Sequence, residues 1–510
     1  MKQIIMKTKY IWLLAVLLGF TACNNDDDSS SSMDEVLPTL TAGEADFSNY
    51  IAVGASFTAG FTDNALFIAS QENSFPNILS MKFDMLGGGS FSQPLMNDNI
   101  GGLLFNGVQM PDGTFGPRLY FNGSGPVVLP DTPTTEATTV LGGTFNNVGV
   151  PGAKSFHLGV EGYGFANPYF GRMASNPMAS MIGDAVGQSP TFFTLSEIGG
   201  NDVLSYATSG GTGIDQTGNL NPATYGNNDI TDPMVFAGSF SASVDALTAN
   251  GAKGVVTNVP YITSLSHFTT VPYNPVPLDA GTAAAVNAAY APYNGGIVQA
   301  FAYLVGVGAI SQDDADAEIA KRTIMFEASE TNAIVIMDED LTDLTAINPQ
   351  LVSMRQANAD DLVVLPASSF IGTEAVPGNP LSINGVAVPL ADKWVLTPEE
   401  QLAIKNATDA YNVTIEAVAS ANGLALVDFK SILIEASTTG IDSGDYTLTT
   451  NLVTGGLVSL DGVHLTSRGY AVMANEMMRA IDATYGSNFE ASGNFVDCGD
   501  YPTNYNPSLR

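Results

Sequence analysis

The chain has 510 residues, 45% of them hydrophobic, so it can bury a large core in roughly one to three domains. Its 51 acidic residues outnumber 17 basic ones and give a formal net charge of −34, which repels phosphate backbones and argues against nucleic-acid binding. Only 13% of the residues are charged, as in extracellular proteins with long polar loops.

The N-terminus carries the features of a secretion signal. Three lysines precede an apolar run at 11–20, which is too short to span a bilayer but suits the core of a signal peptide over residues 1–22. The next residues, Phe20-Thr-Ala-Cys23, resemble a bacterial lipobox. This resemblance implies that Cys23 is lipidated and becomes the mature N-terminus; an ordinary secretory signal with an incidental cysteine is the alternative.

Residues 23–45 are expected to form a solvated tether behind the lipidated cysteine. The run of Asn, Asp and Ser after Cys23 contains no apolar residue and cannot fold by itself. Its acidic stretch also resembles the surface-export signal of some Gram-negative outer-membrane lipoproteins. We therefore expect a cell-envelope lipoprotein attached to the outer membrane, facing either the periplasm or the cell surface. Cys498, the only other cysteine, would then have no partner for an intramolecular disulfide.

The body of the chain alternates between predicted strands and helices. Apolar runs predict five strands, at 50–53, 145–150, 191–195, 254–260 and 424–429. Start and stop signals with three-to-four-residue apolar spacing predict helices at 232–251, 397–423 and 466–485. This order indicates an α/β fold, a three-layer α/β/α sandwich with a mostly parallel five-stranded sheet.

Three insertions are expected to decorate this single domain, which we place at residues 46–487 with a C-terminal tail at 488–510. Residues 86–142 are rich in Gly, Pro, Asn and Thr and predict β-rich loops, and residues 208–230 predict another loop. Residues 262–395 predict helices at 278–307 and 313–330, and a small helical subdomain at 264–395 is the alternative to a simple insertion. Since loops at the carboxyl ends of parallel strands border the ligand crevice, we expect these insertions to shape or cover the site.

Polar residues that carry chemistry follow the ends of the predicted strands. Ser56 ends an apolar run in a small-residue turn, Asn201 follows the third strand in Ile198-Gly-Gly-Asn201-Asp202, and Asp461-Gly-Val-His464 precedes the last helix. A serine hydroxyl becomes a useful nucleophile only when a base takes its proton and another group orients that base. The turn around Ser56 alone, or the lone His464, would indicate only a tight turn or a structural histidine; Asp461 three residues earlier favours a triad.

These blocks, in this order, resemble the SGNH or GDSL hydrolase family of esterases and lipases. The matches are Gly54-Ala55-Ser56-Phe57, Gly152, Asn201, and Asp461 with His464, although Ala55 and Phe57 depart from the family's first block. The resemblance implies that Ser56 is the nucleophile, His464 the general base and Asp461 the residue that orients it. It also implies an oxyanion hole made of the Ser56 and Gly152 backbone N–H groups and the Asn201 amide, with no metal or organic cofactor.

The expected function is the hydrolysis of carboxylic esters through an acyl-enzyme, with a small-molecule, lipid or glycan ester as substrate. An acyl lipid ester is slightly favoured because Phe105, Phe115 and Tyr120 fall in the expected lid at 86–142. Removal of O-acetyl groups from a polysaccharide is an alternative with the same triad. A surface-binding lipoprotein without turnover is the alternative from another functional class.

Other candidate residues are expected to be structural. His157 lies near Gly152, but nothing close in the sequence orients it, and Asp202 is expected to fix its loop through local hydrogen bonds. The acidic runs at 313–316 and 338–340 lack the glycine and distal glutamate of an EF-hand loop, so both are expected to be solvated faces.

Overall fold

The computed structural model of the protein describes residues 37–379 and 381–510. The predicted signal peptide, Cys23 and the tether up to residue 36 lie outside the described residues. One compact unit spans Thr39–Arg510, so it begins before residue 46, where we expected the domain to start. In this segment the Thr41 N–H donates to Oδ1 of Asn488 at 2.7 Å, and Ala45 is buried in the main core.

A five-stranded sheet lies at the centre of this unit, and all of its neighbouring strands are parallel. Its order is β15-β8-β7-β1-β6, with bounds Ala425–Val427, Lys253–Thr257, Phe192–Ser196, Tyr50–Gly54 and Asn147–Gly149. Strands β1 and β7 are buried along their whole length, which explains their nearly continuous apolar sequences. The predicted α/β fold with a five-stranded parallel sheet is thereby confirmed.

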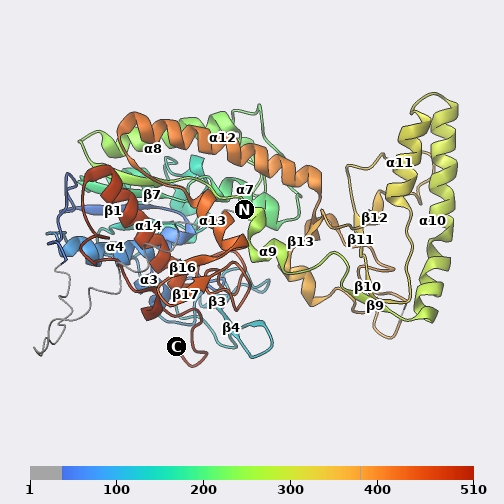
Figure 1. Ribbon diagram of the computed structural model, residues 1–510, viewed down its shortest axis with the longest axis horizontal. Coiled ribbons are helices and arrows are strands. Elements are labelled where there is room, and N and C mark those ends of the chain that lie inside the picture. The colour runs from blue at the N-terminus through green and yellow to red at the C-terminus, as the bar shows by residue number, and fades with distance from the viewer. Residues whose placement is uncertain (1–36, 380) are drawn as a thin grey trace, which may run out of the picture. The chain divides into compact units, whose positions relative to one another are not determined.

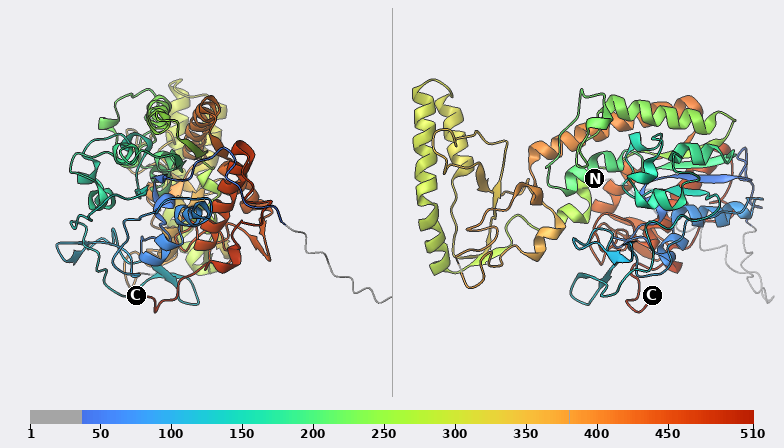
Figure 2. Two further views of the ribbon diagram at one scale, coloured as in Figure 1. Left: turned by 90° about the vertical axis from the view of Figure 1, so that its left-hand side faces the viewer. Right: turned by 180° about the vertical axis from the view of Figure 1, so that it is seen from behind.

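Helices cover both faces of the sheet (Figures 1 and 2). Helices α8 (Pro233–Thr248) and α12 (Pro398–Asn422) pack together on one face, while α4 (Phe75–Asp84) and α14 (Ser467–Tyr485) pack together on the other. The predicted start signals operate as expected. The Asp232 side chain accepts hydrogen bonds from the first turn of α8, and Thr397 forms a capping box with Glu400 at the start of α12.

The remaining elements are short or lie in the insertions. The other helices are α2 (Ser56–Ala59), α3 (Ile68–Glu72), α5 (Pro168–Met173), α6 (Met181–Val186), α7 (Gly200–Thr208), α9 (Ser266–Thr269), α10 (Ala280–Gly306), α11 (Gln312–Arg322) and α13 (Phe429–Thr438). Within residues 37–379 and 381–510, no helix combines the length and the apolar character that crossing a bilayer requires.

Within the described residues, the additional strands form six two-stranded antiparallel sheets. Their bounds are β2 (Leu104–Phe105) with β3 (Val108–Gln109), β4 (Leu119–Phe121) with β5 (Pro126–Val128), β9 (Val276–Leu278) with β10 (Ser329–Asn332), β11 (Val335–Met337) with β12 (Met354–Gln356), β13 (Leu362–Val363) with β14 (Val395–Leu396), and β16 (Ile441–Ser443) with β17 (Tyr446–Leu448). The first two pairs lie in residues 86–142, for which β-rich loops were predicted.

The insertion at 262–395 is mixed rather than helical, and its second predicted helix is too long. Helix α11 ends at Arg322 instead of continuing to residue 330. The chain then becomes extended because two asparagines of α10 hold its backbone. Asn294 bonds both the N–H and the carbonyl of Ile324, and Asn287 does the same for Phe326, at distances of 2.8–3.0 Å.

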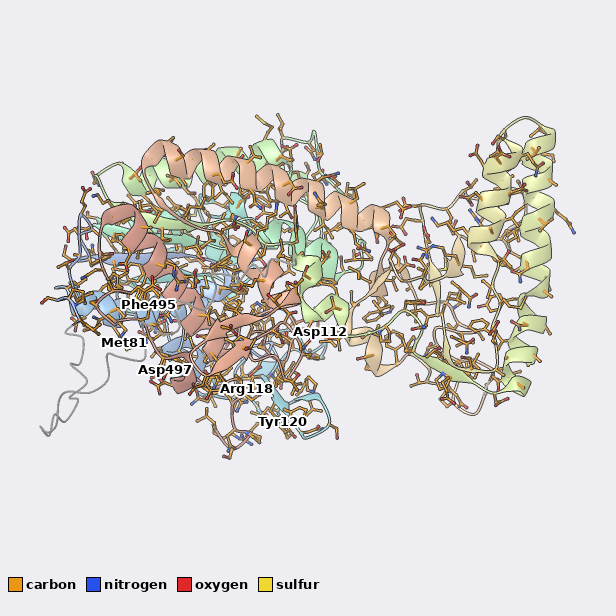
Figure 3. All side chains as sticks on the ribbon, viewed as in Figure 1. Met81, Asp112, Arg118, Tyr120, Phe495 and Asp497 are labelled. Carbon is orange, nitrogen blue, oxygen red and sulfur yellow. The ribbon has the colours of Figure 1, made fainter. Side chains whose placement is uncertain are left out.

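The segment expected as a tail, residues 488–510, packs against the body of the unit. Tyr505 is buried, and its hydroxyl lies 2.5 Å from Oγ of Ser467. The fully buried Arg118, labelled in Figure 3, donates to the carbonyl oxygens of Asn506 and Leu509 at 2.8 and 3.3 Å. Composition alone could not predict this packing, because the segment is polar and its contacts are with residues that are far away in the sequence.

Two glycines allow the turn that carries Ser56 to approach the sheet. A Cβ atom on Gly149, at the end of β6, would lie 2.3 Å from the Ala59 nitrogen and 2.6 Å from the Thr58 carbonyl carbon. A Cβ on Gly54, at the end of β1, would lie 2.0 Å from Oγ1 of Thr58. Because backbone atoms cannot move aside as a flexible side chain can, helix α2 requires a glycine at position 149.

Gly149→Ala is therefore expected to lower the free energy of unfolding by about 1–3 kcal/mol, the usual cost of overpacking a well-packed core. Chemical denaturation followed by circular dichroism measures this change. Gly142→Ala is the matched control, since a Cβ there meets no atom within 4 Å, and it should stay within about 0.5 kcal/mol of wild type. Equal stability of the two variants would contradict the close packing of α2 on β6.

Candidate active site

Ser56 is the first residue of α2, directly after the buried strand β1. Its side chain is nearly buried, with 7% of its surface exposed. The first N–H groups of a helix have no partner inside the helix, and within residues 37–379 and 381–510 the Ser56 N–H meets no acceptor. This N–H group therefore stays available to a ligand beside the hydroxyl.

His464 and Asp461 complete a continuous hydrogen-bonded chain to Ser56. Nε2 of His464 lies 3.0 Å from Oγ of Ser56, and Nδ1 of His464 lies 2.9 Å from Oδ2 of Asp461. An ionised carboxylate only accepts hydrogen bonds, so Nδ1 donates to Asp461. In the neutral ring Nε2 is then left as the acceptor for the Ser56 hydroxyl proton.

The Asp461 carboxylate is stabilised in its ionised form by several donors. Burial alone would raise its pKa, but the charge and hydrogen bond of His464 and the backbone N–H groups of His464 and Val463 hold the pKa well below its usual range. The Asn64 N–H also donates to Oδ2 at 2.8 Å. Asp461 therefore remains an anion beside the imidazole, as orientation of a general base requires.

Two phenylalanines hold the imidazole in place. The Phe61 ring lies 4.6 Å from the His464 ring between centroids, and the Phe57 ring packs edge-on at 5.8 Å. Phe57 stands where the resembled family has leucine, and here it serves as one wall around the base. The imidazole that faces Ser56 is thus packed against two aromatic rings.

The two other expected oxyanion donors lie at the same end of the sheet. Asn201 is in the first turn of α7, and one N–H of its side chain donates to the Ala153 carbonyl at 2.9 Å. Gly152 follows β6, the strand paired with β1, at a φ of +80° that favours glycine. Its N–H, like that of Ser56, has no acceptor in the described part of the chain.

Glu197 supports the Ser56 turn and was not anticipated from the sequence. Its carboxylate accepts hydrogen bonds from the Ala55 and Thr58 N–H groups at 2.7 and 2.8 Å and from Oγ1 of Thr58 at 3.0 Å. Ala55, the N-cap of α2, has no side chain that could accept these bonds. The signal available in the sequence was a charged residue directly after the apolar run of β7. In the structure this residue has a φ of +51°, which is uncommon for a residue other than glycine.

The remaining histidines and Asp202 take other roles. Nδ1 of His157 accepts from the Lys154 N–H at 3.0 Å and its ring stacks on Tyr163, so it does not contact the triad. His267 lies beside the triad, with its Nδ1 3.4 Å from the Asp461 carbonyl. Asp202 accepts from the N–H and hydroxyl of Ser155 at 2.9 and 2.6 Å, which fixes the loop after β6.

An apolar pocket opens beside Ser56. Its cavity volume is about 100 Å³. Its walls come mainly from α7, α13, α14 and the segment after β8, with Leu204, Val259, Ile432, Leu433, Leu457 and Met473 among the lining residues. A second hollow, which shares Asn201 and Leu204 with the first, exposes His464 and His267.

This lining corrects the expectation that residues 86–142 cover the site. No residue of that insertion lines either hollow in the described part of the chain. Phe105 instead packs on Phe115, and Phe115 on Tyr169. Apolar side chains in a long loop often pack against one another or against neighbouring elements rather than over a site. Their presence therefore did not predict a lid.

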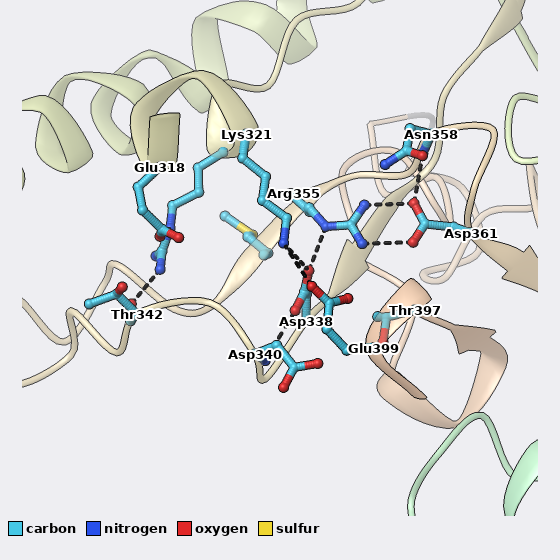
Figure 4. A network of polar contacts seen from close by, with 12 residues as sticks. Glu318, Lys321, Asp338, Asp340, Thr342, Arg355, Asn358, Asp361, Thr397 and Glu399 are labelled. Carbon is cyan, nitrogen blue, oxygen red and sulfur yellow. Dashed lines mark hydrogen bonds and ion pairs between the residues drawn. The ribbon is translucent and has the colours of Figure 1, made fainter. Parts of the chain in front are cut away.

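The acidic run at 338–340 is only partly the solvated face that we expected, because Glu339 and Asp340 are exposed but Asp338 is not. Asp338 is fully buried and pairs with Arg355 at 2.5 Å, and Arg355 binds Asp361 with two further hydrogen bonds of 2.6 and 2.7 Å (Figure 4). In residues 37–379 and 381–510, one group of three acidic side chains is close enough to share an ion: Glu339, Asp392 and Glu400. None of the three lines the hollows at the triad.

Comparisons with protein-family models, with curated proteins and with solved structures found no match to this chain. What the site can do is therefore argued from its geometry.

The protonation of Glu197 should be visible in the stability of the protein. Burial raises its pKa to about 7 against hydrogen bonds that lower it, so the folded state keeps a proton that the unfolded chain releases above about pH 4.5. The stabilisation from this group is complete below that pH and is lost as the pH rises through 7. Between pH 5 and 7.5, the free energy of unfolding of wild type should therefore fall by about 2–3 kcal/mol more than that of Glu197→Gln.

Denaturant titrations at pH 5, 6 and 7.5 measure this slope. Glu416→Gln, at an exposed position of α12, is the control for the loss of one charge. Asp63 is buried, which raises its pKa to about 7 as well, so the variant should keep part of the wild-type slope. Parallel profiles for Glu197→Gln and wild type would show that this carboxyl does not exchange its proton on folding.

Proposed function

We propose that this protein is a serine hydrolase of the SGNH or GDSL type that cleaves carboxylic esters. The observation that carries the proposal is the unbroken chain from Asp461 through His464 to Ser56, with distances of 2.9 and 3.0 Å. A buried serine at a helix start, an oriented imidazole and free backbone N–H groups are the components of acyl transfer. A protein that only binds a ligand needs none of this alignment.

In the proposed mechanism Ser56 Oγ attacks the ester carbonyl while Nε2 of His464 takes its proton. Negative charge then develops on the carbonyl oxygen, and the N–H groups of Ser56, Gly152 and the Asn201 amide are the proposed donors to it. The imidazolium returns the proton to the leaving alcohol, which leaves an acyl group on Ser56. His464 next takes a proton from water, and the resulting attack releases the acid and restores the serine.

The apolar pocket favours an ester with an acyl chain over an acetyl ester as the substrate. Its walls beside Ser56 are almost entirely apolar, and each methylene buried there contributes about 0.8 kcal/mol. An acetyl group would leave most of this space without contacts. We propose in addition that the enzyme works in the cell envelope, attached to the membrane through a lipid on Cys23.

The decisive experiment compares the purified full chain with its Ser56→Ala variant on p-nitrophenyl butyrate. Loss of the nucleophile should lower kcat/KM by at least about a thousandfold. Ser205→Ala, a serine in the hollow next to the triad, is the matched control and should stay within about threefold of wild type. A fluorophosphonate should label wild type at Ser56, as located by mass spectrometry. Equal rates for Ser56→Ala and wild type would instead favour a binding protein without turnover.

A second variant tests whether the acyl group enters the apolar pocket. Ile432→Trp places a large ring in its α13 wall and should lower kcat/KM for p-nitrophenyl octanoate at least about tenfold, because several buried methylenes lose their place. Hydrolysis of p-nitrophenyl acetate should change less than threefold. Ile434→Trp, on the exposed side of the same helix, is the control. An equal loss on both esters would place the acyl chain elsewhere.

A further inference from the structure

A cluster of carboxylates away from the triad joins three separate segments of the chain. Glu339 follows β11, Asp392 begins the short 3₁₀ turn Asp392–Trp394, and Glu400 lies in the first turn of α12. One carboxylate oxygen from each residue lies within 4.8 Å of those from the other two. Like charges this close repel strongly where burial excludes water.

Two oxygens in this cluster are buried without a partner. Glu400 is 4% exposed, and its Oε2 accepts from the Thr397 N–H and hydroxyl at 2.6 and 3.0 Å. Its Oε1 and Oδ1 of Asp392 are buried, yet neither meets a donor anywhere in residues 37–379 and 381–510. A buried acceptor without a donor is costly, so these two atoms indicate a missing positive partner.

The nearby cations do not supply that partner. Arg355 is bound to Asp338 and Asp361, and the Lys321 ammonium lies 3.7 Å from Asp338 and 3.8 Å from Glu399 (Figure 4). In the described part of the chain, the buried oxygens of Glu400 and Asp392 are thus left without a cationic side chain as partner.

We propose that Glu339, Asp392 and Glu400 bind a calcium ion. Calcium takes six to eight oxygen ligands at about 2.3–2.6 Å, so ligands on opposite sides of the ion lie up to about 5 Å apart. The three oxygens lie within 4.8 Å of one another and so within this limit. Magnesium demands strict octahedral geometry at about 2.0–2.1 Å, whereas three carboxylates on separate segments suit the more flexible shell of calcium.

The surroundings leave room for the other ligands of such an ion. A hollow of about 680 Å³ borders Glu339 and Asp392, and Gly211, Asp343 and Ser353 also line it. Water in this hollow can fill the remaining coordination positions. Gly211 packs directly against the Glu400 carboxylate, because a Cβ there would lie 1.6 Å from Oε1.

Calcium at this position would tie the insertion at 262–395 to helix α12. Its role is structural, and the triad residues are not among its ligands. The inference therefore stands independently of the proposed ester hydrolysis.

The experiment uses the purified full chain after removal of metal with EDTA. Calorimetric titration with calcium chloride should show one site with a dissociation constant of about 10⁻⁴–10⁻³ M, the range of extracellular calcium modules. Calcium at 5 mM should raise Tm by about 1–2 °C, given the size of the chain. Absence of binding heat and of a Tm shift up to 10 mM calcium, or tighter binding of magnesium, would overturn the assignment.

Terbium provides a local readout, because it replaces calcium and emits when a nearby tryptophan is excited. Trp394 is in the same 3₁₀ turn as Asp392, and the chain has only two tryptophans. We expect sensitised terbium emission that calcium abolishes by competition. Trp394→Phe should lose the emission but keep the calorimetric response to calcium.

Glu339→Gln separates a calcium site from a group of carboxyls that merely share protons. Glu339 is exposed and does not cap α12, so this variant should fold. Without calcium its Tm should equal or exceed that of wild type because a repulsion is removed, while the calcium-induced shift and the terbium emission disappear. Asp313→Asn, in the exposed acidic run of α11, is the control and should respond like wild type. A full calcium response in Glu339→Gln would refute the site.

Discussion

The parallel direction of the central sheet is the constraint on which the site depends. Because every strand runs the same way, the segments that follow the strands meet at one edge of the sheet. Strand β1 delivers Ser56 there, β6 delivers Gly152, and β7 delivers Glu197 and Asn201. The loop before α14 then only has to bring His464 within 3.0 Å of a hydroxyl that is already in place.

Much of this arrangement could be predicted from the sequence because it depends on local signals. Strands β1 and β7 could be predicted from their apolar runs, and the ends of α8 and α12 from their capping residues. The pairing of Ser56 with His464 followed from the chemistry that a nucleophile requires. In these cases a short stretch of residues contains the physical cause of the structure.

The features that could not be predicted depend on contacts between distant segments. The end of α11 is set by Asn287 and Asn294 of α10, which bond the backbone of the extended chain after it. The support of the nucleophile turn by Glu197 joins residues of two neighbouring strands. Similarly, the apolar walls beside Ser56 come from helices α7, α13 and α14 rather than from the aromatic loop at 86–142. None of these partners is adjacent in the sequence.

The 3.0 Å contact between Ser56 and His464 also sets the order in which activity can arise during biosynthesis. Ser56 is made 408 residues before the imidazole that must deprotonate it. A nascent chain that does not yet include His464 thus carries a hydroxyl without its base. In the proposed enzyme, ester cleavage would begin only once residue 464 has been made and has folded against Ser56.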